Sequence, residues 1–322
     1  MIRSILVSAV IGALSVVPVT NMCVFLPQNN MKIAVGSLED KGITRKQFDA
    51  VMDQAEALYA PVIAARGGHL VLKRLWDDNT VNASAQQNGK EWVLNMYGGL
   101  ARHATITQDG MALVVCHELG HHLGGAPKYG DTDWASNEGQ ADYFANLKCL
   151  RRMFTAPGAS AFTRPKGGDE ATARAGCEAA WKSASERTLC TREAMAGMSV
   201  TSLFRVLRNQ TVLPKFDTPD PIVVTEMQDG HPDTQCRLDT YYAGSLCTRG
   251  VGDGLSETDP AQGTCMPAGG QTVGYRPRCW YKPGADGVPA GGAAMAARAM
   301  SASPKTPALV GQLSQSGLWT GL

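Results

Sequence analysis

The feature that most constrains this chain is the stretch VVCHELGHHLGG at residues 114–125, which contains the pattern H-E-x-x-H. Residues four apart on a helix lie one turn above each other on the same face, so His117 and His121 present two imidazoles to one metal ion. Glu118 is the next residue along, and its side chain can reach a water molecule held by that ion. Two histidines cannot hold a catalytic ion alone, so the chain must supply a third ligand.

The residues on either side of this pattern favour a helix over residues 110–123. Asp109 is a suitable N-cap, and Gly124-Gly125 followed by Pro127 is a helix stop. The longer zinc motif H-E-x-x-H-x-x-G-x-x-H requires a histidine at position 127, where this chain has proline. The third ligand is therefore expected later in the chain.

The next predicted helix, over residues 137–153, begins with the letters NEGQAD and offers such a ligand. Glu138 and Asp142 are four apart and share a helical face. If Glu138 binds zinc, Asp142 lies where it can accept the second ring N–H of a ligand histidine. Gly139 and Ala141 are small and would let the two helices approach closely. A solvated acidic first turn is the ordinary alternative, but it does not predict both carboxylates on one face.

Two neighbours of the motif have simpler interpretations. His122 points about 100° away from His121 around the helix and is expected to be a packing residue. Cys116 also points off the metal-facing side and is expected to be a small buried side chain.

The region before the motif predicts a helix from residue 45 to 59 and strands at 69–75, 80–85 and 91–97. Asn88-Gly89 is typical of a hairpin turn between the last two strands. The expected edge strand, along which an extended peptide would pair, contains Asn82, Ala83, Ser84 and Ala85.

The two zinc motifs together, H-E-L-G-H at 117–121 and E-G-Q-A-D at 138–142, resemble the gluzincins, most closely the M48 family of zinc metallopeptidases. Upstream, residues 81–85 and 98–100 are similar to that family's N-A-x-A and G-L-L segments. Downstream, residues 231–237 are similar to its H-P…R segment. The interval between the zinc motifs is shorter than M48 members often have, and the downstream cysteines are foreign to the family pattern.

The resemblance implies an α+β, zincin-like fold, in which a small sheet with an edge strand packs on the H-E-x-x-H helix and on a second, Glu-bearing helix. It implies one Zn²⁺ ion held by His117, His121 and Glu138. Glu118 would act as general base on a water at the ion, and Asp142 would orient a ligand histidine.

The developing oxyanion needs a hydrogen-bond donor beyond zinc. The candidates in the H-P…R block are His231, Arg237, Tyr241 and Tyr242. His231 ranks first because Pro232 restricts the backbone before it and can aim the ring. It could equally serve as a fourth zinc ligand that closes the site.

The chain is expected to have four parts. Residues 1–22 are typical of a secretory signal, with a basic start and an apolar stretch too short to span a bilayer. A metallopeptidase domain follows over 23–247, then a Gly/Pro/Cys-rich stapled segment over 248–292 and a low-complexity tail over 293–322. Membrane attachment would require a lipid anchor at Cys23, which the poor lipobox before it disfavours.

Nine cysteines behind a signal sequence predict disulfides. None forms a C-x-x-C pair, which argues against a cysteine zinc knuckle. Cys236–Cys247 and Cys265–Cys279 are the expected local bridges, although spacing alone does not fix connectivity. The second bridge is far in sequence from the zinc motifs and is expected to leave the zinc site undisturbed.

These features favour a secreted or periplasmic zinc endopeptidase whose partner is a peptide or protein substrate. The near-balanced formal charge of +1 gives no reason to expect nucleic acid as a partner. One alternative is a zinc-stabilised, non-catalytic binding protein. The presence of Glu118 argues against it, because a structural site needs no general base. Another is a zinc hydrolase that acts on a non-peptide or cell-wall amide.

Overall fold

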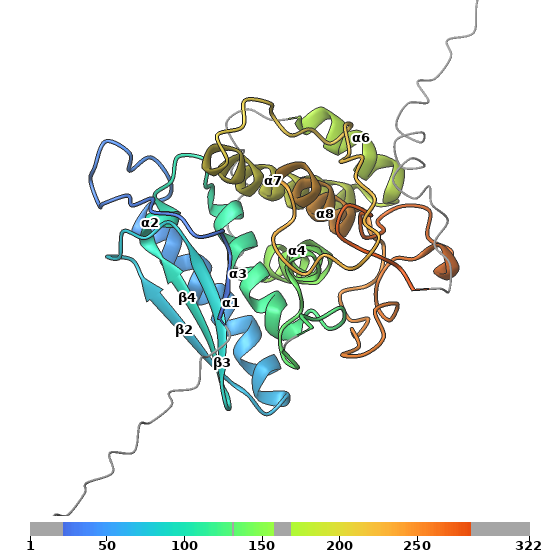
Figure 1. Ribbon diagram of the computed structural model, residues 1–322, viewed down its shortest axis with the longest axis horizontal. Helices are drawn as coiled ribbons and strands as arrows, with labels where there is room; N and C mark the ends of the chain where they lie inside the picture. The colour runs from blue at the N-terminus through green and yellow to red at the C-terminus, as the bar shows by residue number, and fades with distance from the viewer. Residues whose placement is uncertain (1–21, 131, 158–168, 285–322) are drawn as a thin grey trace, which may run out of the picture.

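The computed structural model describes residues 22–130, 132–157 and 169–284. The expected tail, the last part of the expected stapled segment (285–292) and the expected signal up to residue 21 lie outside this part of the chain. The described chain is an α+β protein, in which a small mixed sheet lies to one side of a group of helices (Figure 1).

Four strands form the sheet in the order β1-β3-β4-β2, and their bounds are Met22–Val24 (β1), His69–Leu75 (β2), Ala83–Asn88 (β3) and Glu91–Tyr97 (β4). β2 runs parallel to β4, whereas β3 pairs antiparallel with both β4 and β1. The β3–β4 hairpin turns at Gly89, whose φ of 59° suits a residue without a side chain. The predicted strands β2 and β4 and the predicted hairpin are therefore confirmed.

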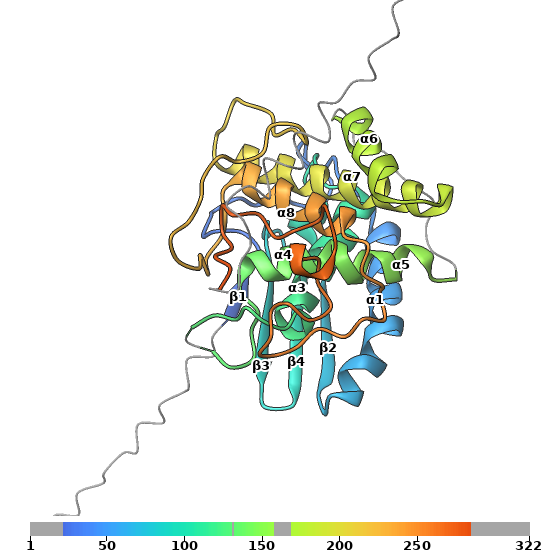
Figure 2. The same cartoon turned by 90° about the vertical axis from the view of Figure 1, so that its right-hand side faces the viewer.

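The expected edge strand does not lie at an edge. β3 begins at Ala83 rather than at residue 80, and its outer side is paired with β1 (Figure 2). In this pairing Cys23 faces Ala85 and Val24 faces Ser84. β1 was not expected because a strand of three residues is too short to show an alternating pattern.

The described helical segments are α1 (Arg45–Ala65), α2 (Gly98–Ala101), α3 (Gln108–Leu123), α4 (Glu138–Phe144), π-helical η1 (Ala145–Leu150), α5 (Arg151–Thr155), α6 (Glu170–Ala180), α7 (Ala184–Leu207), α8 (Thr234–Leu246) and the short 3₁₀ turn η2 (Pro267–Gly269). α3 lies between the sheet and α4, and it also contacts α1 and α7 (Figure 1). Every residue of α3 is consequently buried. Within the described ranges, no helix combines the length and the apolar character needed to cross a bilayer.

The caps of the two motif-bearing helices differ from expectation. Thr107 rather than Asp109 caps α3, because its hydroxyl accepts a hydrogen bond from the Gly110 amide at 3.0 Å. Asp109 lies in the first turn and accepts two hydrogen bonds from Arg192 of α7, at 2.9 and 2.7 Å. The second predicted helix is resolved into α4, η1 and α5 in succession, with Asn137 as its N-cap.

Eight of the nine cysteines form four disulfides, Cys116–Cys149, Cys177–Cys190, Cys236–Cys279 and Cys247–Cys265. Disulfide formation was thus correctly predicted, but both expected local pairs are wrong. Cys236 lies in the first turn of α8 and Cys247 follows its last residue. A helix rises about 1.5 Å per residue, so these two cysteines are held roughly 16 Å apart, beyond the reach of a disulfide. Cys116 is buried as expected, but it is bonded to Cys149 rather than reduced.

A buried glutamate lies between α7 and the end of η1. Burial raises the pKa of Glu193 to about 8, although Arg151 lies 3.5 Å away and opposes the shift. Arg151 also donates hydrogen bonds to the carbonyl groups of Gly244, Ser245 and Arg249. These carbonyls satisfy the guanidinium, so it does not depend on an ionised Glu193.

Glu193→Gln should make the stability of the protein less sensitive to pH. The folded-state pKa lies above the ordinary glutamate pKa of 4.5, so the folded state binds the extra proton between these two values. The unfolding free energy of the wild type should therefore fall as pH rises from about 5 to 8, whereas a glutamine has no proton to lose. Melting temperatures across this range test this, with exposed Glu178→Gln as control. Parallel curves for wild type and Glu193→Gln would contradict it.

Candidate metal centre

Two helices bring three potential metal ligands together. His117 and His121 come from α3 and Glu138 from α4, and all three side chains are fully buried. The two Nε2 atoms are 3.1 Å apart, and they lie 3.3 Å (His117) and 3.7 Å (His121) from the nearer Glu138 oxygens. Ligands at about 2.1 Å from a tetrahedral ion lie roughly 3.4 Å from one another. The three residues are therefore spaced as ligands of a single ion would be.

Small residues explain why the two helices come so close. A side chain at Gly120 would place its Cβ within 2.9 Å of the Cα of Ala141, so α3 and α4 meet backbone to backbone at this point. Ala141 thus has the role expected of it. Gly139 does not, because a Cβ there would come within 2.1 Å of the Trp280 ring rather than meet α3.

The second ring nitrogen of each histidine is held by the protein. His117 Nδ1 lies 2.7 Å from Asp142 Oδ1, and His121 Nδ1 lies 2.8 Å from the carbonyl oxygen of Ser136. Both acceptors require a proton on Nδ1 in the neutral ring, which leaves a lone pair on each Nε2, the atom that lies near Glu138. Asp142 thus occupies the position that its spacing predicted.

Asp142 is bonded to more than His117. Its Oδ1 also accepts hydrogen bonds from Arg237 Nη2 at 2.6 Å and from the Tyr241 hydroxyl at 2.7 Å. Burial alone would raise the pKa of Asp142, but Arg237 and His117 hold it below its ordinary value. Burial would likewise lower the pKa of His117, yet Asp142 and Glu138 raise it to about 9.

The donor atoms fit a divalent metal ion. Glu138 Oε2 is fully buried and forms no hydrogen bond in the described chain, although His117 Nε2 lies 3.3 Å from it. Burial would raise the pKa of Glu138, but His231, His117 and His121 lower it, so the carboxylate is charged. Buried polar atoms almost always have partners, and a cation facing two imidazole nitrogens would supply this one.

Glu118 is placed beside this cluster without belonging to it. It is fully buried on α3, and neither of its carboxylate oxygens has a hydrogen-bond partner among the described residues. Burial raises the pKa of Glu118 to about 8. A cation bound at the neighbouring cluster would lower this pKa and favour the charged carboxylate, because a nearby positive charge stabilises the ionised form.

The four oxyanion candidates lie in different places. His231 Nε2 is 3.6 Å from Glu138 Oε2, at the border of the cluster. Arg237 and Tyr241 are also close, but both are bonded to Asp142. Tyr242 packs in a separate apolar cluster, where its hydroxyl donates to the carbonyl of Ala173, so it is not part of the site.

One site residue was missed by the sequence analysis. The Tyr129 hydroxyl donates a hydrogen bond to Glu138 Oε1 at 2.9 Å, and its ring stacks near His121. Tyr129 comes from the loop between α3 and α4, where no periodic pattern could indicate its direction. His122, by contrast, is core-packed as expected, stacked between Trp92 and Trp134.

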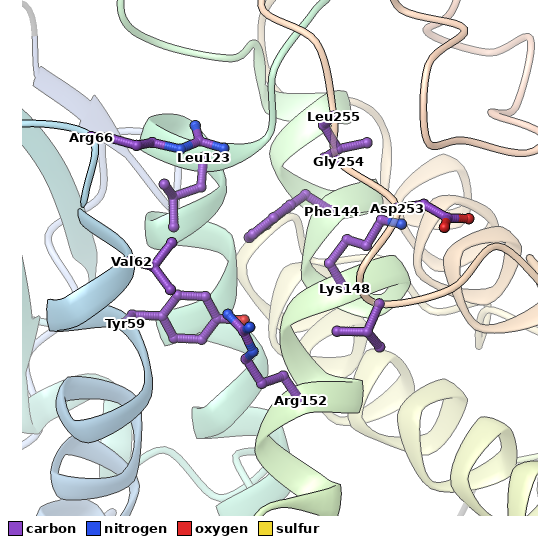
Figure 3. Close-up of a pocket in the computed structure, with 11 residues that line it drawn as sticks. Tyr59, Val62, Arg66, Leu123, Phe144, Lys148, Arg152, Asp253, Gly254 and Leu255 are labelled. Atoms are coloured by element: carbon purple, nitrogen blue, oxygen red, sulfur yellow. The ribbon is translucent and has the colours of Figure 1, made fainter. Parts of the chain in front are cut away.

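A pocket of about 110 Å³ lies elsewhere, between α1, the end of α3, the α4–α5 region and the loop around residue 254 (Figure 3). Tyr59, Arg66, Lys148 and Arg152 contribute to its wall. None of the three clustered ligands or Glu118 lines it, so it is separate from the candidate centre.

No family model, no curated protein and no solved structure matches this chain. One other group of potential ligands occurs among the described residues, formed by Asp220, Cys236 and Cys279. Its two sulfur atoms are joined in a disulfide, so they offer no thiolate to an ion. The cluster of α3 and α4 is therefore the candidate metal centre.

Glu138→Ala should sharply lower metal occupancy, because it removes the only carboxylate among the three clustered ligands. Asp142→Asn should weaken metal binding less, by roughly 10- to 100-fold, since it alters the support of His117 and not a ligand. Metal content after dialysis and chelator competition measure both effects. Tyr143→Phe, also on α4 but bonded to Gly274, is the control and should keep its metal. Wild-type affinity in Glu138→Ala would place the third ligand elsewhere.

Proposed function

We propose that this protein is a zinc-dependent endopeptidase with a zincin-like fold, resembling the gluzincins and most of all the M48 family. The observation that carries the proposal is the buried, unpartnered carboxylate of Glu118, adjacent in sequence to the ligand His117. Hydrolysis needs such a general base beside the ion, whereas a structural metal site does not. A zinc-stabilised binding protein is therefore the weaker alternative.

Zinc, when bound, polarises the scissile carbonyl and lowers the pKa of the attacking water. Glu118 takes a proton from this water and then delivers it to the leaving amine. Because α3 is buried along its whole length, the Glu118 side chain is kept inside the protein and does not turn out to solvent. Two imidazoles and one carboxylate are a ligand set well suited to zinc.

His231 is the residue best placed to stabilise the oxyanion. Its Nε2 lies 2.7 Å from a peptide carbonyl oxygen, that of Val24, and 3.6 Å from Glu138. An imidazole N–H in this position can donate to a carbonyl oxygen that gains negative charge during hydrolysis. Arg237 is a positioning residue in this proposal, because its Nη2 is committed to Asp142 and acts on His117 through it.

A peptide is the substrate class that β3 favours. Its outer side pairs with an extended main chain, as a bound peptide would pair. A non-peptide or cell-wall amide would make no use of such a ladder. The four disulfides fit an oxidising compartment, and we therefore propose a secreted or periplasmic location.

Glu118→Gln should retain zinc and lose hydrolysis of a peptide library, because only the proton acceptor is removed. Zinc content and turnover are measured on the same preparation, with and without chelator. Glu193→Gln, a second fully buried glutamate outside the cluster, should keep its activity. Full turnover by zinc-loaded Glu118→Gln would rule out the mechanism.

His231→Ala should lower kcat by roughly 10²–10³, the usual loss for one oxyanion donor, with little change in melting temperature. His231→Gln retains an N–H donor and should recover part of the loss. Steady-state kinetics and a melting curve provide the measurements. An unchanged kcat removes His231 from the mechanism, and a raised kcat indicates instead that it closes the site.

A further inference from the structure

The N-terminal end of the described chain lies where a substrate is expected. Residues 22–26, called the N-terminal segment below, form β1 and its continuation along the outer side of β3. The pairing is antiparallel and extends past β1, because the Phe25 amide donates to the carbonyl of Ala83 at 3.0 Å. The β3 residues involved are those predicted to pair with a peptide.

Polar side chains also bind the main chain of this segment. The carbonyl of Val24 lies 2.7 Å from His231 Nε2, and the carbonyl of Phe25 accepts from Arg237 Nη1 at 3.2 Å. Asn82 bonds both main-chain groups of Leu26, through its Oδ1 at 2.9 Å and its Nδ2 at 3.3 Å. Three consecutive residues are thus held by main-chain contacts that do not depend on their side chains, as in peptide recognition.

The side chain of Phe25 fills the space beside the metal centre. It is fully buried, and its ring lies edge-on to His117 with a centroid separation of 4.9 Å. Phe204 and the guanidinium of Arg237 close the other sides. One imidazole, that of His231, contacts the carbonyl preceding Phe25 and lies next to the ligand Glu138. The carbonyl of the peptide bond between Val24 and Phe25 is therefore the one that His231 contacts at the border of the centre.

We propose that the N-terminal segment is an intramolecular occupant of the substrate cleft, bound as a peptide substrate would be, so that an external peptide enters only after the segment leaves. This proposal rests on the proposed peptidase function, because only that function makes the space beside β3 a substrate cleft. An ordinary edge strand would leave its carbonyl groups to solvent or to the sheet. Here two successive carbonyls face His231 and Arg237, side chains that border the metal centre.

The test compares Phe25→Ala with Phe48→Ala, each combined with Glu118→Gln to prevent turnover. Both rings are fully buried, but Phe48 belongs to α1 and packs on Trp76 rather than on His117. The probe is a fluorescent peptide of residues 22–28 with serine in place of Cys23, titrated into the zinc-loaded full chain. If the segment occupies the cleft in most molecules, the apparent affinity for the probe equals the intrinsic affinity multiplied by the fraction of molecules whose cleft is open. Phe25→Ala should therefore bind the probe at least about 10-fold more tightly than the chain that retains Phe25, and Phe48→Ala should not.

Hydrogen exchange gives a second measurement that needs no change at Phe25. A saturating amount of the probe should accelerate exchange of the Phe25 and Leu26 amides, which are bonded to Ala83 and Asn82, and should leave the amides of α1 unaffected. Equal probe affinity with and without Phe25, or unchanged exchange under saturation, overturns the proposal.

The same variants with Glu118 restored separate the two hypotheses. If Phe25→Ala binds the probe more tightly but no variant hydrolyses peptides, the segment occupies a peptide groove and the peptidase function fails. If the wild type hydrolyses peptides and Phe25→Ala gains neither binding nor activity, the function stands and the occupancy is refuted.

Discussion

A single buried carboxylate connects the candidate metal centre to the rest of the fold. Asp142 Oδ1 accepts hydrogen bonds from His117, Arg237 and Tyr241, so one oxygen joins α3, α4 and α8. Charged hydrogen bonds in a buried setting are strong, and removing the carboxylate would leave its buried donors unsatisfied. Since Arg237 also binds the carbonyl of Phe25, the support of a metal ligand and the contact with the N-terminal segment share one guanidinium.

The sequence predicted those parts of the site that depend on local periodicity. His117 and His121, like Glu138 and Asp142, are pairs four residues apart, and a helix places such pairs on one face whatever surrounds it. The loop residue Tyr129 has no such constraint, and nothing in its neighbours indicates that it reaches Glu138. The roles of Arg237 and Tyr241 depend on how α8 packs against α4, 95 and 99 residues away from Asp142, which no local pattern encodes.

The two clearest failures concern long-range pairing. Spacing suggested a Cys236–Cys247 bridge, but an intervening helix holds the two residues apart, and each pairs with a later cysteine instead. Residues 82–85 were predicted to form an edge strand that pairs with a peptide, yet their partner in the described chain is the N-terminal segment. A three-residue strand directly after an apolar signal-like stretch has no pattern of its own. Its partner strand, and not its composition, gives it an extended structure.

The irregular C-terminal segment packs against α4, although its distance in sequence from the zinc motifs predicted that it would not affect the zinc site. The Trp280 ring lies against Gly139, where no side chain would fit, and Arg276 Nε donates to Gln140 Oε1 at 2.7 Å. Cys279 joins this segment to α8 through its disulfide. The outer face of α4 is thus covered by chain 136 residues further on. Gly139 is therefore required by this covering segment, which packs on the helix that carries the candidate ligand Glu138 and is fastened to α8 by a disulfide.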